Sequence, residues 1–140
     1  MEELCLFCKI IAGEIPATKV YEDEHTFAFL DIRPVNLGHT LVIPKKHFKN
    51  LYELESPYEN AVMQTAQKVA RAIKKGLSAD GVNLGMNNDA PAGQIIFHAH
   101  LHVIPRSIND GLMHWGHVTV TPEQIEEVGE KIKLELQGND

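Results

Sequence analysis

The apolar positions of this chain recur at helical spacing in two long stretches. Each stretch opens on a helix-start signal, Ser-Pro-Tyr-Glu at 56–59 and Thr-Pro-Glu-Gln at 121–124, which combines a capping box with proline at the first helical position. We therefore predict one helix that ends at Gly76 and another that ends at Gly138. Both apolar stripes are expected to belong to the core; they comprise Val62, Ala66, Val69 and Ile73 in the first helix and Ile125, Val128 and Ile132 in the second.

Most of the remaining chain is divided into short segments typical of strands. Asp23-Glu24 is the turn of a predicted hairpin, Pro44 ends a later strand, and a short helix over 5–12 stops at Gly13. The predicted strands cover 19–22, 26–31, 40–43 and about 82–86. Hairpin-like strands with two separated main helices indicate an α+β fold on a mostly antiparallel sheet. A length of 140 residues favours one domain, 1–140.

Residues 97–106, FHAHLHVIPR, place three of the eight histidines at every second position. Alternation with period two is a strand pattern, so His98, His100 and His102 are expected to share one face. The other face would pack on the core through the intervening apolar residues, which are Phe97, Ala99, Leu101 and Val103. The imidazoles would then line a surface or a cleft.

A row of imidazoles is compatible with several functions. A catalytic zinc ion held by three histidines would keep an open position for water, although neighbouring side chains of one straight strand converge poorly on a single ion. Neutral imidazole is also a nucleophile toward phosphorus, and adjacent histidines can donate hydrogen bonds to phosphoryl oxygens. A purely structural row is the third alternative. The sequence has no GxxxxGK[ST] loop and no evident carboxylate cluster for magnesium, and a histidine nucleophile needs neither.

Net charge and cysteine content limit which binding partners, which cellular location and which cysteine chemistry are expected. A net charge of −6 argues against a general binder of nucleic-acid polymers. No apolar run approaches the roughly 18 residues of a membrane span, and early acidic residues differ from a secretory signal, so we expect no membrane association and a cytoplasmic location. Cys5 and Cys8 form a C-x-x-C pair, which is a redox motif, half of a zinc site or two unrelated thiols. A tetrahedral zinc site would need two more ligands, for which histidine is available.

The segment HAHLHVI at 98–104 resembles the motif of the histidine-triad (HIT) nucleotide hydrolases and transferases. Three further segments extend the resemblance over about 5–106: CLFCKIIAGEIPA, AFLDIRPVNLGHTLVIPKKH and NNDAPAGQ. The resemblance implies a HIT-like domain with its triad core at about 5–106, a C-terminal extension with a helix over 107–140, and a homodimer. His102 occupies the position where the transferase branch typically has glutamine, which favours the hydrolase branch.

The family resemblance implies cleavage at the α-phosphate of purine nucleotide conjugates, either nucleoside phosphoramidates or dinucleoside polyphosphates. His100 would be the nucleophile that carries the nucleotidyl intermediate, and His102 and His39 would contact phosphate or tune the site. The implied substrate contacts are Asp31 for the ribose hydroxyls, Asn87 and Gln94 for the phosphate and leaving group, and Phe7, Ile10, Ile32 and Leu41 for the base.

The zinc-bearing branches of this family imply a metal site as well. In those branches an N-terminal C-x-x-C joins the histidine of the PKKH segment and the first triad histidine, which here are Cys5, Cys8, His47 and His98. Four protein ligands close a zinc site, so this zinc would be structural. It would tie the N-terminal helix to the triad strand.

One position departs from the family pattern. After Gly93-Gln94 the family commonly has serine or threonine, whose hydroxyl reaches the scissile bridge, whereas this chain has Ile95. An isoleucine side chain cannot protonate an amine leaving group. Ile95 is therefore the feature that best supports an alternative to the leading hydrolase interpretation. In this alternative the protein binds purine nucleotides and interacts with other proteins but has little turnover. A zinc metallohydrolase that uses the histidine row as its metal site is the second alternative.

Overall fold

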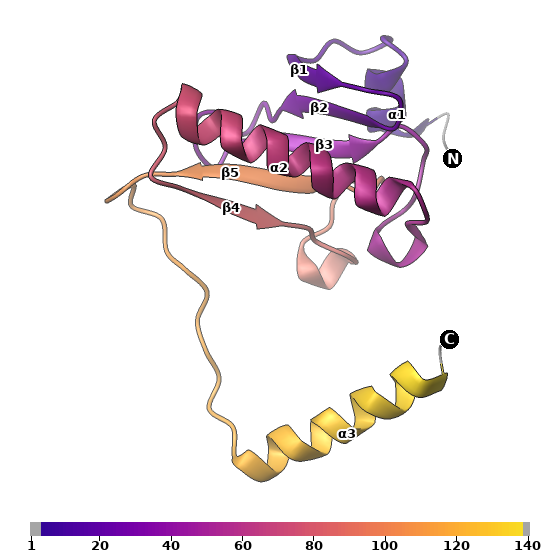
Figure 1. Cartoon of the computed structure of the whole chain (residues 1–140), viewed down its shortest axis with the longest axis vertical. Helices are drawn as coiled ribbons and strands as arrows, with labels where there is room; N and C mark the ends of the chain where they lie inside the picture. Colours follow the sequence, from indigo (N-terminus) through magenta and orange to yellow (C-terminus); the bar gives the residue numbers. More distant parts are fainter. Residues whose placement is uncertain (1–3, 139–140) are drawn as a thin grey trace. The chain divides into compact units, whose positions relative to one another are not determined.

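The computed structural model describes residues 4–138 and shows three helices and a five-stranded antiparallel sheet with the strand order β1-β2-β3-β5-β4 (Figure 1). This confirms the predicted α+β fold. The strands are β1 Lys19–Glu22, β2 Thr26–Leu30, β3 Thr40–Pro44, β4 Gly81–Gly85 and β5 Leu101–Arg106, and the helices are α1 Leu6–Ile11, α2 Tyr58–Gly76 and α3 Pro122–Gly138. Two short 3₁₀ helices lie at Leu51–Glu53 and Ala90–Ala92.

By internal contacts the chain divides into two compact units, Met1–Asp110 and Gly111–Asp140. The first unit contains the sheet with α1 and α2, and the second contains α3. The assignment of 1–140 to one HIT-like domain stays a prediction. No helix within residues 4–138 is both long and apolar enough to span a membrane.

Helix α2 covers one face of the sheet, as Figure 1 shows. Its predicted apolar stripe is buried and packs against strand residues of the same cluster, which confirms that stripe as core; the cluster includes Val62, Ala66, Val69 and Ile73 with Ala28, Val42, Leu101 and Val103. Full burial of a valine, leucine or isoleucine side chain contributes roughly 1.5–3 kcal/mol. This packing fixes the position of β5, and with it the side chains that β5 directs to the other face.

Helix α1 provides apolar cover on the opposite face. Phe7 and Ile10 are buried there against strand residues of a second cluster, which are Phe27, Phe29, Leu41 and Ile43. Because successive strand residues point to opposite faces, His102 lies on this side, between Leu101 and Val103 of the α2 side. The sheet therefore separates a mainly apolar layer, which includes the buried hydrogen-bonded pair Thr26 and Thr65, from a layer that contains imidazoles.

Two helix predictions need correction. Helix α2 begins at Tyr58, with Pro57 at the N-cap position and no side-chain cap, so Ser56 does not form the expected capping box. The reason is that proline occupies the cap itself and not the first helical turn, which leaves the serine one residue too far from the free N–H groups. At the start of α3 the box does form: Thr121 N–H donates to Gln124 Oε1 at 2.8 Å, and Gln124 N–H donates to Thr121 Oγ1 at 3.1 Å.

The apolar stripe of α3 was expected to be core, and this is wrong for the described residues. Ile125, Val128 and Ile132 are 62%, 53% and 55% exposed, and no residue of α3 is buried. An amphipathic pattern shows only that a helix can bury one face. It does not specify the surface that covers this face.

Candidate active site and metal centre

The strand that carries the histidines is shorter than its sequence pattern predicts. Strand β5 begins at Leu101, so only His102 belongs to it. Ala99 N–H donates to the carbonyl of Phe48 at 2.8 Å, and the carbonyl of His98 accepts from the ring of His100 at 2.7 Å. Because these backbone groups bond outside the sheet, the three imidazoles do not form one straight row. Phe97 is also 39% exposed, so it is not part of the core face.

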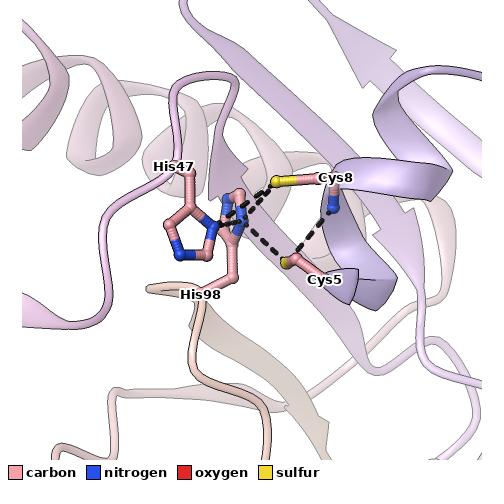
Figure 2. Close-up of side chains that lie close together, drawn as sticks. All are labelled: Cys5, Cys8, His47 and His98. Carbon is pink, nitrogen blue, oxygen red and sulfur yellow. Dashed lines mark hydrogen bonds between the residues drawn. The ribbon is translucent and has the colours of Figure 1, made fainter. Parts of the chain in front are cut away.

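The ring of His98 lies beside the side chains of Cys5 and Cys8 at the start of α1 and beside that of His47 (Figure 2). Its Nδ1 lies 3.4 Å from Cys5 Sγ, 3.6 Å from Cys8 Sγ and 3.1 Å from His47 Nδ1. Cys8 Sγ lies 3.4 Å from His47 Nδ1, and all four ligand atoms fall within 4.8 Å of one another. Zinc bonds of about 2.0–2.3 Å in a tetrahedron require ligand separations of about 3.3–3.8 Å, so the cluster has the size of a zinc site.

The proton positions in this cluster also suit a cation. His98 Nε2 lies 2.9 Å from the carbonyl of Pro44, to which it must donate, so the neutral ring directs the lone pair of Nδ1 toward the cysteines. Such an outer hydrogen bond is typical of metal-ligating histidine. Burial lowers the pKa of His98 to about 4, so its ring is neutral near pH 7, as a metal ligand must be.

Local structure explains why the two cysteines converge. Cys5 is the N-cap of α1, and its Sγ accepts from the Cys8 N–H at 3.4 Å. A spacing of three residues across the first helical turn brings both side chains to the same end of the helix. The structure thus brings together all four predicted ligands, Cys5, Cys8, His47 and His98, from three separate segments.

His100 has the proton arrangement of a nucleophile. Its Nδ1 lies 2.7 Å from the carbonyl of His98, so Nδ1 carries the proton and the neutral ring has its lone pair on Nε2. The side chain is 7% exposed, and the Phe7 ring packs edge-on at 5.2 Å between centroids. Burial lowers the pKa of His100, which keeps the ring neutral and nucleophilic at neutral pH.

His39 and His102 form a hydrogen-bonded chain with a defined direction. Val35 N–H donates to His39 Nδ1 at 3.0 Å, so neutral His39 has its proton on Nε2. That nitrogen lies 2.9 Å from His102 Nδ1 and donates to it, which places the proton of neutral His102 on Nε2. The rings of His100 and His102 are 5.0 Å apart between centroids. His100 therefore has a free lone pair on Nε2, and the neighbouring ring of His102 has an N–H donor on its Nε2.

Asp31 lies next to this chain. One carboxylate oxygen accepts from Arg33 N–H at 2.8 Å, and the other lies 3.8 Å from His39 Nε2. Asp31, His39 and His102 also have the spacing of a metal cluster. The Val35 N–H argues against an ion there, because it occupies His39 Nδ1 and keeps the proton on the nitrogen that would have to bind the ion.

The structure separates the residues predicted to contact the base. Phe7, Ile10 and Leu41 lie together in the core cluster under α1, whereas Ile32 is 92% exposed. Asn87 is half-buried and lies against Gly93, where a Cβ would come within 3.2 Å of Asn87 Nδ2. Their roles as substrate contacts stay predictions. The groups that direct the imidazoles were not predicted, since they are backbone groups of Pro44, His98 and Val35 that leave no signal in the residue type.

Protonation of His102 should lower the stability of the fold. Burial, with His100 and His39 nearby, lowers the pKa of His102 from 6.5 to about 4. The unfolded chain therefore binds this proton more tightly, and stability falls as pH decreases from about 6.5 toward about 4. The free energy of unfolding, measured by urea titration at several pH values, should fall less steeply in His102→Gln, whose amide oxygen can still accept from His39. Equal slopes for both proteins would contradict the shifted pKa.

Comparison with known proteins agrees with this geometry. Residues 12–109 match the HIT domain family. The chain is 53% identical over 104 residues to Protein hit of Bacillus subtilis, covering 74% of this chain and 72% of that protein. It is 44% identical over 108 residues to a protein of Arabidopsis thaliana named adenylylsulfatase HINT3, covering 77% of this chain and 55% of that protein.

Solved structures show the same likeness. A Zn-bound histidine triad family protein from Mycobacterium smegmatis aligns over the whole of both chains with a TM-score of 0.77 and 36% identity. Its bound zinc is in keeping with a Cys/His cluster that has the size of a zinc site. The family match and the arrangement of the three histidines lead to one conclusion: this chain belongs to the histidine triad (HIT) family.

Proposed function

We propose that this protein hydrolyses purine nucleotide conjugates at the α-phosphate, with His100 as the nucleophile. The observation that carries this proposal is the hydrogen bond from His100 Nδ1 to the carbonyl of His98, which leaves the Nε2 lone pair available in a buried, neutral ring. Membership of the HIT family and the relative named adenylylsulfatase support a nucleotide substrate.

The reaction would proceed in two displacements. His100 Nε2 attacks the α-phosphorus, so a phosphorus–nitrogen bond forms while the bond to the leaving group breaks. Water then attacks the same phosphorus, the phosphorus–nitrogen bond breaks, and a nucleoside monophosphate and the free imidazole are released. His102 Nε2–H donates to a phosphoryl oxygen as negative charge develops on it, and His39 keeps that proton in place through His102 Nδ1.

Two of the predicted substrate contacts, Asp31 and Asn87, belong to the proposed site. Asp31 Oδ2 would accept from a ribose hydroxyl, and the half-buried Asn87 amide would donate to phosphate. Zinc at Cys5, Cys8, His47 and His98 would have a structural role, because four protein ligands leave no position for water. A homodimer and a cytoplasmic location remain part of this proposal.

The covalent intermediate can be tested directly. With enzyme in excess over an adenylated substrate, rapid quenching and intact-mass measurement should reveal one adenylyl group, which fragmentation assigns to His100. Because two in-line displacements cancel, a substrate with a chiral α-phosphorus should also give product with retained configuration. Inversion would show a direct attack by water and would rule out the nucleophilic role of His100.

The exposed Ile95 should limit turnover of substrates with a poor leaving group. Ile95→Ser adds a hydroxyl where the family commonly has one, so it should raise kcat/KM for nucleoside phosphoramidates more than for substrates that release phosphate or pyrophosphate. The ratio of the two kcat/KM values should rise by about tenfold or more, because a well-positioned general acid typically contributes about 10²- to 10⁴-fold. Since Ile95 is 83% exposed, no cavity is expected.

Ile108→Ser is a matched control, because Ile108 is another exposed isoleucine, 76% accessible, outside the proposed site. It should leave the ratio unchanged. The alternative function, nucleotide binding with little turnover, is favoured by Ile95 alone. It predicts tight nucleotide binding, measured by calorimetry, and no increase in turnover of either substrate class in Ile95→Ser.

A further inference from the structure

Asp89 has a backbone conformation that side-chain-bearing residues rarely adopt. Its φ of 75° and ψ of 153° fall in a region that is essentially restricted to glycine. The residue lies in the segment NNDAPAGQ, between Asn87 and the histidine segment. Strained backbone persists only where surrounding contacts hold it, and it is found most often at functional sites.

Two of the contacts that hold Asp89 come from Gln94, beside those from Ala92 N–H to its carbonyl and from Tyr52 to its side chain. Asp89 N–H donates to Gln94 Oε1 at 2.8 Å, and the Asp89 carbonyl accepts from Gln94 N–H at 3.1 Å. The Gln94 side chain also donates to the carbonyls of Lys49 at 2.8 Å and Ile96 at 3.1 Å. Asn50 Nδ2 approaches Gln94 Oε1 at 3.5 Å. These contacts tie the 87–94 loop to the segment that follows His47, one of the four predicted zinc ligands.

This bonding leaves the Gln94 amide little capacity for a substrate. A primary amide has two N–H donors, and both are directed to backbone carbonyls. Gln94 is 4% exposed. Contact with a phosphate group, as the family resemblance implies, would require breaking a buried hydrogen bond, which is costly.

The loop that Gln94 holds lies directly against the side chain of Asn87. Gly93 has a φ of 102°, and a Cβ there would come within 3.2 Å of Asn87 Nδ2. The turn from Asp89 to Gly93 is closed by hydrogen bonds from Ala92 and Gly93 N–H to the carbonyls of Asp89 and Ala90. The position of the Asn87 amide therefore depends on the conformation of the whole turn.

We infer that Gln94 is a positioning residue, which holds Asp89 in its strained conformation and thereby places Asn87 for the reaction. The inference rests on the proposed function, because it assigns Asn87 to the phosphate of the substrate. Gln94 itself would not touch the substrate. A displacement of about 1 Å in a positioned group can lower turnover by about 10²-fold.

A double-mutant experiment separates positioning from direct contact. Gln94→Met retains the length of the side chain and removes its hydrogen bonds, and should lower kcat by about 10- to 100-fold, with a smaller effect on KM. Asp89→Gly alone should have near-normal activity, since glycine adopts this conformation without strain. In the Gln94→Met background, Asp89→Gly should restore at least about fivefold of the lost kcat. No restoration would overturn the inference and favour direct contact between Gln94 and the substrate.

Ala92→Gly is the matched control, because it adds a glycine to the same turn at a residue with helical backbone. It should not restore activity in the Gln94→Met background; equal restoration would mean that general flexibility, and not relief of strain at Asp89, is responsible.

Hydrogen exchange of the backbone amides in 87–94 gives a readout that does not depend on turnover. Exchange should be faster in Gln94→Met and slower again when Asp89→Gly is added. Unchanged exchange in Gln94→Met would overturn the inference. A wild-type protein that hydrolyses no nucleotide conjugate would contradict the proposed function only, and the exchange data would still decide whether Gln94 holds the loop.

Discussion

Replacing His100 with alanine should lower kcat by at least about 10⁴-fold, because loss of a nucleophile typically costs more than loss of any other single group. The nucleotide should still bind, since the proposed contacts at Asp31 and Asn87 are retained. Single-turnover kinetics and calorimetric binding of a nucleoside monophosphate measure the two properties separately. His102→Ala should be milder, about 10²- to 10³-fold, because it removes one donor to the phosphoryl oxygens.

A matched control is available in His25→Ala. His25 packs against Tyr58 at 5.3 Å between ring centroids, near the turn between β1 and β2, and belongs to neither histidine cluster. It should have near-normal turnover. If His100→Ala also kept near-normal turnover, the covalent mechanism would be wrong, whatever the fold of the variant.

The second large effect concerns zinc. Protein purified without chelators should contain one zinc per chain, and Cys8→Ser should lose the metal together with about 10 °C or more of Tm. At about 3 °C per kcal/mol for a chain of this size, this corresponds to roughly 3 kcal/mol. The physical reason is that metal binding contributes directly to folding when the site ties separate segments together. Here α1, the segment around His47 and the segment around His98 share one cluster.

Chelation provides the control for this prediction. EDTA should lower the Tm of the wild-type protein and leave that of Cys8→Ser unchanged, because that variant has no metal to lose. Turnover should decline only as the protein unfolds. Immediate loss of turnover in a protein that stays folded would support the zinc metallohydrolase alternative. A zinc-free wild-type protein with the same Tm before and after EDTA would disprove the structural metal site.

Local sequence signals predicted most of the secondary structure. The stripe of α2 is buried as expected, and the capping box at Thr121 forms at the start of α3. Predictions failed at the start of α2, for the local reason that proline occupies the cap, and at the apolar face of α3, where tertiary packing decides what is buried. At α2 the chain enters the helix with Pro57 at the N-cap, and α3 has an apolar stripe whose residues are exposed.

The sequence by itself determined which chemical groups this protein has and which of them occur together. The C-x-x-C pair, the PKKH histidine and the histidine triad are visible as residue types. Together with the resemblance to the histidine-triad family, they predicted the four cluster residues Cys5, Cys8, His47 and His98. The spacing of residue types also predicted an α+β fold, because periodicity reflects which side of an element is buried.

Only the tertiary structure decided what each imidazole faces. The carbonyls of Pro44 and His98 and the N–H of Val35 select the tautomers of His98, His100 and His39, and so decide which nitrogen of each ring carries the proton and which has the free lone pair. Almost every residue carries these backbone groups, so residue type cannot indicate which of them will meet a histidine. The carbonyl of Pro44 that orients His98 lies more than 50 residues away in the chain, as does the carbonyl of Phe48 that accepts from Ala99, so only folding brings these groups to the histidine segment.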